Sequence, residues 1–134
     1  MRLLIDTCAY SALLAGDQRV AEELGTADVV LLSPIVIGEL YDGFMGSRRE
    51  SANRSLLTAF RQKPRTSLVP ITDATAEWFA SLKQQLKRKG TLIPINDVWI
   101  AASCLEHGAG LLSLDRHFSA VDGLLLRLLP PAEA

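Results

Sequence analysis

Four acidic side chains in this sequence are placed to do chemistry, each at the end of a predicted strand or near the start of a predicted helix. In chain order they are Asp6, Glu39, Asp97 and Asp115. Carboxylates that gather in one place repel one another unless a cation lies between them, and Mg²⁺ and Mn²⁺ prefer oxygen ligands. The pattern therefore predicts a metal-dependent phosphodiesterase that binds Mg²⁺ or Mn²⁺ through these four acids.

Short apolar runs alternate with longer helical patterns along the chain, which is typical of βαβ units and a parallel sheet. We expect strands over residues 2–6, 28–33, 67–71, 110–114 and 124–128. The carboxyl ends of parallel strands share one edge of the sheet, where ligands bind. Acids as far apart in the sequence as Asp6 and Asp115 are therefore expected to meet in one cleft.

The segments between these strands predict helices with recognisable start and stop signals. We expect helices over residues 7–15, 18–25, 34–46, 47–62, 73–89 and 96–107, with either Asn96 or Asp97 at the start of the last one. Ser33 before Pro34 is an N-cap followed by proline at the first helical position. Thr7 and Asp73 are the expected N-caps of their helices, and Gly90 ends the helix that begins near Asp73.

Each of the four acids also has a structural explanation that needs no metal. Asp97 is explained at least as well by a helix cap as by a metal role, and Asp115 is explained about as well by a turn. Asp6 is harder to explain in this way, because it ends an apolar strand where an unpaired buried carboxylate is costly. Glu39 has an exposed surface position on its helix as the alternative. No single acid establishes a metal site, so the prediction rests on the presence of all four acids in this order.

Four ordered motifs in this chain resemble those of the PIN-domain nucleases, specifically the VapC-type toxins of toxin–antitoxin pairs. They are Leu4-Ile5-Asp6-Thr7, Ser33-Pro34 ahead of Glu39-Leu40, Asn96-Asp97-Val98-Trp99-Ile100-Ala101-Ala102, and Leu111-Leu112-Ser113-Leu114-Asp115-Arg116-His117-Phe118. Ser113 stands where threonine is more usual in that family, which keeps the hydroxyl. The resemblance implies a three-layer α/β/α sandwich with a central parallel sheet, endoribonuclease activity on RNA and a cognate antitoxin partner. It covers residues 1–130 as one nuclease domain, with 131–134 as a short tail.

The resemblance also implies a role for each site residue. Asp6, Glu39 and Asp97 would hold one Mg²⁺ or Mn²⁺ directly or through water, and Asp115 would hold a second ion or position water. Thr7 and Ser113 offer hydroxyls that could orient a carboxylate, although an N-cap and strand-end packing explain them equally well. Asp42 shares the helical face of Glu39, but solvent exposure is its preferred interpretation.

The composition sets further bounds. With 134 residues and 49% hydrophobic residues, the chain is predicted to form one globular domain. Its net charge of −1 provides no general attraction to nucleic acid, so any RNA contact must come from the basic segments 48–65 and 83–89. Solvated helix faces are the default interpretation of both segments.

Cysteine and histidine residues point to no further metal site. Cys8 and Cys104 are expected to be buried free thiols in a reducing cytosol. Cys104 and His107 have a ligand-like spacing but too few neighbours for zinc, and His117 is expected to be solvated rather than bound to phosphate. The early charge at the N-terminus and the lack of a long apolar run predict a cytoplasmic protein that is not membrane-bound.

Partners and competing functions complete the expectations. Apolar residues crowd the helix over 34–46, which predicts a homodimer and a groove for an apolar antitoxin helix. A haloacid-dehalogenase-like phosphatase would need a second aspartate where Cys8 stands, and a receiver domain would need a lysine after a late strand. A non-catalytic acidic α/β binding module remains the open alternative.

Overall fold

The fold is built on a parallel sheet whose carboxyl edge faces one side of the molecule. The structure is a computed structural model that describes residues 1–131, so residues 132–134 of the predicted tail lie outside the described part. Within residues 1–131 the sheet has five strands in the order β3-β2-β1-β4-β5, and all four neighbouring pairs are parallel. The strands are β1 (Arg2–Ile5), β2 (Val29–Leu32), β3 (Thr66–Leu68), β4 (Gly110–Ser113) and β5 (Leu126–Leu128).

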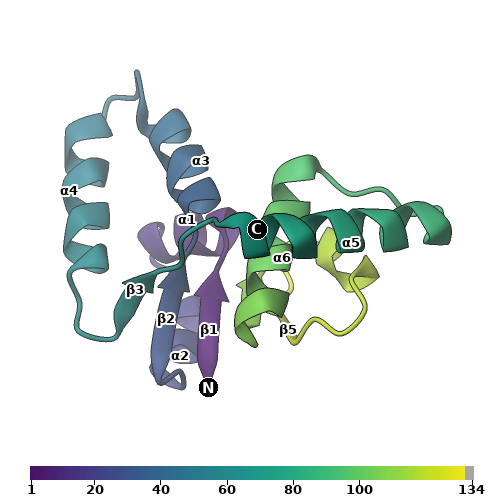
Figure 1. Ribbon diagram of the computed structural model, residues 1–134. Coiled ribbons are helices and arrows are strands. Elements are labelled where there is room, and N and C mark those ends of the chain that lie inside the picture. Colours follow the sequence, from purple (N-terminus) through teal and green to yellow (C-terminus); the bar gives the residue numbers. More distant parts are fainter. Residues whose placement is uncertain (132–134) are drawn as a thin grey trace.

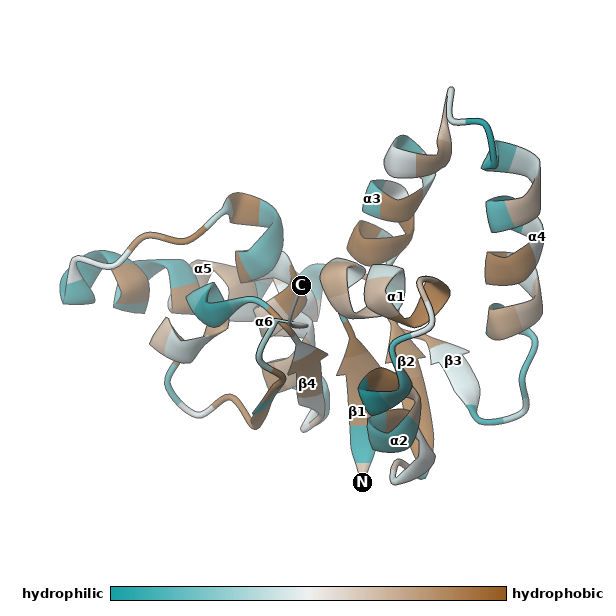
Figure 2. Cartoon of the chain, turned by 180° about the vertical axis from the view of Figure 1, so that it is seen from behind, coloured by the Kyte–Doolittle hydropathy of each residue, from teal (hydrophilic) through white to brown (hydrophobic). Residues whose placement is uncertain are grey.

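Helices cover both faces of this sheet. They are α1 (Thr7–Leu14), α2 (Gln18–Gly25), α3 (Pro34–Phe44), α4 (Glu50–Arg61), α5 (Asp73–Lys89) and α6 (Ile95–His107), with a 3₁₀ turn η1 (Arg116–Ala120). Figure 1 shows α5 and α6 in front of the sheet, and Figure 2, seen from behind, shows α1 and α2 on the other face. The predicted three-layer α/β/α architecture is therefore confirmed. The α3–α4 pair extends beyond the carboxyl ends of the strands (Figure 1).

All five predicted strands and all six predicted helices are present, with boundaries that shift by up to three residues. The strand expected over 67–71 ends at Leu68, because Pro70 has no N–H to continue the ladder. The helix expected over 47–62 begins at Glu50, since Gly46 adopts φ 76 and turns the chain there. The 3₁₀ turn at Arg116–Ala120 was not predicted.

Three predicted N-cap residues differ from those in the structure. Asp6 rather than Thr7 caps α1, because Asp6 has the extended N-cap backbone and its carboxylate accepts from the Ala9 N–H at 2.9 Å. Thr72 rather than Asp73 caps α5. Helix α6 begins at Ile95 after Pro94, so neither Asn96 nor Asp97 is its N-cap.

The central strands hold the carboxyl edge in a fixed position because they are buried on both faces. Leu3, Leu4 and Ile5 of β1 and Leu111 and Leu112 of β4 are fully buried. Continuous apolar runs of this kind are expected where helices cover both faces of a parallel sheet. In Figure 2, β1 and β2 are brown over most of their length, and α2 in front of them is largely teal.

Most of the apolar side chains that crowd α3 are used by the core of this chain. Val36, Leu40 and Phe44 are buried, and Ile35 and Tyr41 pack against the same core. Met45, just after α3, is 60% exposed. The buried side chains of α3 therefore serve the fold of this chain.

Among residues 1–131, no helix combines the length and the apolar character needed to cross a membrane.

Candidate metal centre and catalytic site

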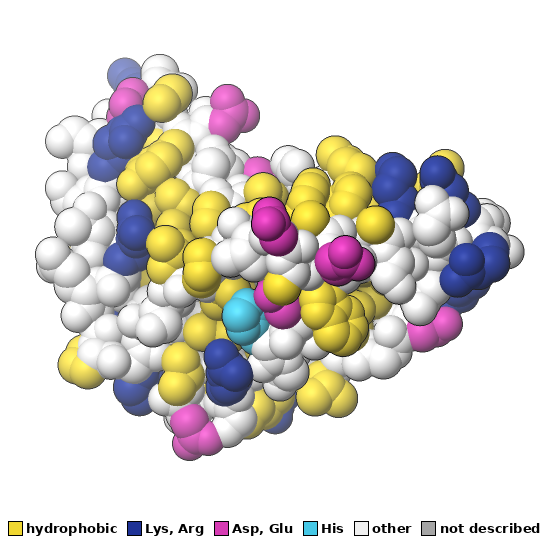
Figure 3. Space-filling view, in the orientation of Figure 1, with side chains coloured by type: hydrophobic (Ala, Val, Ile, Leu, Met, Phe, Trp, Pro, Cys, Tyr) yellow, Lys and Arg dark blue, Asp and Glu magenta, His cyan; other side chains and the backbone are white. Residues whose placement is uncertain are grey.

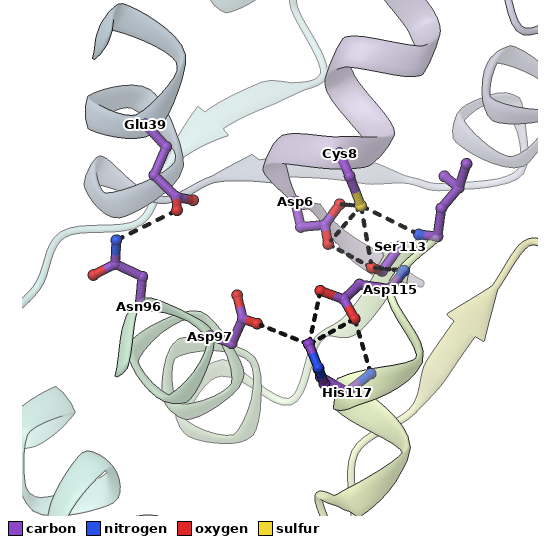
Figure 4. Close-up of polar contacts among 9 residues, drawn as sticks. Asp6, Cys8, Glu39, Asn96, Asp97, Ser113, Asp115 and His117 are labelled. Carbon is purple, nitrogen blue, oxygen red and sulfur yellow. Dashed lines mark hydrogen bonds and ion pairs between the residues drawn. The ribbon is translucent and has the colours of Figure 1, made fainter. Parts of the chain in front are cut away.

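The structure brings the four predicted acids together in one cavity at the carboxyl edge of the sheet. The cavity has a volume of about 210 Å³, and its lining includes Asp6, Glu39, Asp97 and Asp115. Asp6 directly follows β1, Asp115 follows β4, Glu39 belongs to α3 and Asp97 lies in the first turn of α6. Figure 4 shows the four carboxylates pointing into the same space from these elements.

Asp6 is the most deeply buried of the four acids, with 3% of its surface exposed. Its carboxylate accepts hydrogen bonds from the Ser113 hydroxyl, the Ala9 N–H and the Cys8 thiol. Burial raises the pKa of Asp6 above its usual range, and these hydrogen bonds offset only part of that rise. Asp6 thus caps α1 and also faces the acidic cavity, so the two interpretations weighed from the sequence are compatible.

Glu39 is half-buried and ties three helices together at the cavity. The Thr7 hydroxyl of α1 donates to Glu39 Oε1 at 2.5 Å. From α6, the Asn96 side-chain amide donates to Glu39 Oε2 at 3.3 Å. The carboxylate is therefore held in one orientation toward the cavity (Figure 4), which excludes the freely solvated surface position considered as its alternative.

Asp97 carries the clearest electrostatic evidence of crowding. Its pKa is raised to about 6, first by burial and then by the negative charges of Asp115, Glu39 and Asp6. Because α6 begins at Ile95, the interpretation of Asp97 as a helix cap is wrong. The carboxylate instead projects into the cavity, where neighbouring charges make its ionisation unfavourable.

Asp115 is fixed by the turn that follows β4. Its carboxylate accepts from the His117 N–H at 2.9 Å and so caps the 3₁₀ turn η1. Its own N–H donates to the Ser113 hydroxyl at 2.8 Å, and this hydroxyl in turn donates to Asp6. Ser113 therefore connects the ends of β1 and β4 through two acids, which goes beyond strand-end packing.

Three residues at the cavity were not identified from the sequence. His117 is exposed as expected, yet its ring Nδ1 lies 3.0 Å from Asp115 and 3.9 Å from Asp97. Asn96 binds Glu39, and Cys8 donates to Asp6. Each lies within two residues of a predicted acid, and that proximity was the signal available in the sequence.

The Cys8 thiol forms part of the hydrogen-bond network around Asp6. It accepts from the Leu114 N–H at 3.4 Å while it donates to Asp6. Burial and the nearby charge of Asp6 raise the pKa of Cys8 to about 11. The thiol is therefore neutral at physiological pH, so Cys8 is a hydrogen-bonding group here and not a thiolate ligand.

Other candidates from the sequence lie outside the cavity. Asp42 is exposed and borders a separate trough of about 610 Å³ that it shares with Glu39 and Asn96. Cys104 is fully buried, and burial raises the pKa of its thiol. Within residues 1–131, neither Cys104 nor His107 belongs to a group of three potential metal ligands.

Basic side chains flank the acidic cavity at a distance. Figure 3 shows Lys and Arg side chains along the α3–α4 side and at the far end of α5. The last turn of α5 carries Lys87, Arg88 and Lys89. Arg54 of α4 pairs with Glu50 at 3.1 Å and stacks over the Tyr41 ring. Positive charge is thus available on both sides of the cleft, while the floor is acidic.

The donor set of the cavity fits a divalent cation. Carboxylate oxygens are the ligands that Mg²⁺ and Mn²⁺ prefer. Here four carboxylates line one small cavity, and the crowding that raises the pKa of Asp97 is what a bound cation would relieve. Thr7, Ser113 and Asn96 hold these carboxylates from behind, as partners of metal ligands commonly do.

Comparison with known proteins agrees with this arrangement. Residues 3–124 match the family model described as PIN domain. Ribonuclease VapC4 of Mycobacterium tuberculosis is 30% identical over 90 residues, which are 67% of this chain and 69% of that protein. Ribonuclease VapC5 of the same organism is 26% identical over 120 residues, covering 90% and 87% of the two chains.

Solved structures share the fold. The VapBC2 complex of Rickettsia felis, bound to a DNA fragment from its promoter, contains a chain that superposes with a TM-score of 0.84 at 23% identity, covering 96% of this chain and 98% of that one. FitAcB from Neisseria gonorrhoeae gives a TM-score of 0.77 at 25% identity, covering 92% and 95%. On the family match over residues 3–124 and the similarity to VapC4, the chain belongs to the PIN-domain family and to its VapC ribonuclease branch.

Proposed function

We infer that the chain is an endoribonuclease of the VapC toxin type, and we propose that it hydrolyses RNA phosphodiester bonds with Mg²⁺ or Mn²⁺. The observation that carries this proposal is the single cavity lined by Asp6, Glu39, Asp97 and Asp115 at the carboxyl edge of the sheet. Its relatives VapC4 and VapC5 are named ribonucleases. A non-catalytic binding module is less well supported, because such a module gains nothing from four mutually repelling acids.

The proposed roles follow from the contacts of each side chain. Asp6, Glu39 and Asp97 would hold the ion, and Asp115 would hold a second ion or position a water molecule. Ser113 and Thr7 keep Asp6 and Glu39 in position through their hydroxyls. When bound, a divalent ion offsets charge on the phosphate and lowers the pKa of a water molecule. The protein itself fixes the positions of the carboxylates, and the burial of Asp6 keeps bulk water away from one side of that carboxylate.

We propose that the RNA strand reaches the acids along the trough of about 610 Å³ beside α3. Glu39, Thr7 and Asn96 belong to both the trough and the acidic site. Gly38 and Gly43 border the trough. A Cβ atom added at either glycine would meet no other atom within 4 Å, so the trough is open at these positions. The basic segments 48–65 and 83–89 then contact phosphates on either side, through local rather than net charge.

The proposal includes protein partners and a cytoplasmic place of action. Several similar structures are toxin–antitoxin complexes, including VapBC2 of Rickettsia felis. A groove of about 380 Å³ beside α2 and α4, with Leu24 and Phe60 in its lining, offers a place for an apolar antitoxin helix.

We also propose a homodimer through exposed apolar side chains such as Trp78, Leu92 and Ile95. Both cysteines are free thiols, as a reducing cytosol would keep them.

Expression of this chain alone in a bacterium tests the toxin function. We expect growth arrest with loss of intact cellular RNA, because the proposed endoribonuclease would act without its antitoxin. Asp6→Asn is the control, since it keeps a helix-capping side chain and removes the buried charge. Normal growth at a protein level that equals or exceeds that of the Asp6→Asn control would contradict the toxin proposal.

Light scattering on the purified Asp6→Asn protein measures its molecular mass in solution and so tests the homodimer.

A further inference from the structure

Among residues 1–131, His117 is the histidine that lies beside two acids of the cavity, Asp97 and Asp115. Its ring Nδ1 lies 3.0 Å from Asp115 Oδ1 and 3.9 Å from Asp97 Oδ2. One ligand atom from each of Asp97, Asp115 and His117 lies within 4.8 Å of the other two. These residues come from two elements, α6 and the turn after β4, so their approach is a product of the tertiary fold.

The separations suit a shared cation. An ion that binds nitrogen and oxygen at about 2.1 Å can join two donor atoms that are up to roughly 4.2 Å apart. Both distances from His117 Nδ1, at 3.0 Å and 3.9 Å, fall within that limit. Asp115 is already fixed through the His117 N–H at 2.9 Å. The imidazole is 58% exposed, so it can turn toward an ion without disturbing the core.

An imidazole contributes something that a further carboxylate would not. The cavity already holds four acids, and an imidazole nitrogen adds a donor without adding negative charge. Nitrogen ligands also discriminate between metals. Mg²⁺ is a hard cation that prefers oxygen and keeps its water, whereas imidazole suits first-row transition metals such as Co²⁺, Ni²⁺ and Zn²⁺.

We propose that His117 completes a mixed nitrogen–oxygen subsite with Asp97 and Asp115 that binds first-row transition-metal ions in preference to Mg²⁺. The subsite rests on the proposed function, because it belongs to the same acidic cavity. It adds a specific consequence: the metal preference of this chain depends on a side chain outside the four acids. A role for His117 confined to hydrogen bonding with Asp115 would leave that preference unchanged.

Calorimetric titration with Co²⁺ and with Mg²⁺ tests the subsite. We expect His117→Ala to weaken Co²⁺ binding by about tenfold or more and Mg²⁺ binding by less than about threefold. His117→Gln keeps a side chain that can hydrogen-bond to Asp115 but lacks the imidazole, so it should behave like His117→Ala. His107→Gln is the matched control, because the second histidine of the chain lies away from the cavity beside Glu106.

A spectroscopic measurement gives an independent readout. Pulsed electron paramagnetic resonance of Mn²⁺ bound to the wild type should detect coupling to an imidazole nitrogen, and His117→Gln should remove it. Retained coupling, or equal losses of Co²⁺ and Mg²⁺ affinity, would overturn the subsite. If the wild type cleaves RNA with Mg²⁺ while the variants keep its metal preference, the subsite alone is rejected. If the wild type binds no divalent ion and cleaves no RNA, the proposed function falls as well.

Discussion

Asp6→Asn is expected to abolish RNA cleavage, with a fall in kcat/KM on the order of 10³-fold. The substitution removes a negative charge from the most buried acid of the cavity, where 3% of the residue is exposed. Asparagine still accepts from the Ala9 N–H and is a good N-cap, so α1 should keep its start. The loss would therefore report the charge of Asp6 and not its structural role.

A matched substitution separates these two contributions. Asp17 caps α2 by accepting from the Arg19 N–H at 3.0 Å, and it lies outside the acidic cavity. Asp17→Asn should leave cleavage close to the wild-type rate, while Asp6→Asn and Asp97→Asn should both be inactive. Cleavage of a labelled single-stranded RNA under single-turnover conditions measures the difference. Wild-type rates in Asp6→Asn would show that the buried acid has no part in the reaction.

Asp97→Asn is expected to stabilise the metal-free protein at neutral pH. The pKa of Asp97 is about 6 in the folded chain, against an ordinary value of 3.8, chiefly because of burial and then of Asp115. Between these values the folded state binds more protons than the unfolded state, so the free energy of unfolding falls as pH rises from about 4 to about 6. The full loss is on the order of 2–3 kcal/mol. Asparagine cannot ionise, so the variant avoids this loss of stability.

Urea denaturation in EDTA at pH 4, 6 and 8 measures this effect. We expect Asp97→Asn to match the wild type near pH 4 and to exceed its free energy of unfolding at pH 8. Added Mn²⁺ should stabilise the wild type by about 1–3 kcal/mol at concentrations well above the dissociation constant, and the variant by less. Asp73 also lies in the first turn of a helix but is exposed. Asp73→Asn should therefore be neutral or slightly destabilising, through the helix dipole.

A lower stability of Asp97→Asn than of the wild type at pH 8 would contradict the electrostatic account. It would mean that the carboxylate of Asp97 stabilises the folded chain, for example through the nearby imidazole of His117 at 3.9 Å. That pair is among the contacts that oppose the rise in the pKa of Asp97, and it ranks behind burial and the three neighbouring acids. The sign of the change at pH 8 therefore decides between repulsion and pairing.

Much of the fold followed from the sequence because β1, β2 and β4 are mostly apolar and are separated by segments with helical periodicity. Ser33 before Pro34 predicted the start of α3, and the run through Ile5 predicted a buried β1. Parallel strands then place Asp6 and Asp115 at one edge by topology alone. The approach of the four acids was predictable for this reason, although none of the four identifies the site by itself.

The parts that the sequence did not predict depend on side-chain direction. Whether Glu39 faces the cavity or solvent depends on the rotation of α3, which the Thr7 and Asn96 hydrogen bonds reveal. His117 lies beside Asp97 only because an unpredicted 3₁₀ turn follows β4. Most of the apolar side chains of α3 pack into the core of this chain, which their spacing in the sequence did not show. A sequence pattern gives spacing, but it does not give these orientations.

RNA cleavage by one sample of purified protein, measured first with EDTA and then after excess Mn²⁺ or Mg²⁺ is added back, tests the central claim most directly. The account predicts no cleavage in EDTA, cleavage after the metal is restored, and none at either step for Asp6→Asn. The four acids would then act through a bound cation, as their shared cavity implies. Cleavage at the same rate in EDTA, or no cleavage with either metal, would contradict the assignment of this cavity as a metal-dependent nuclease site.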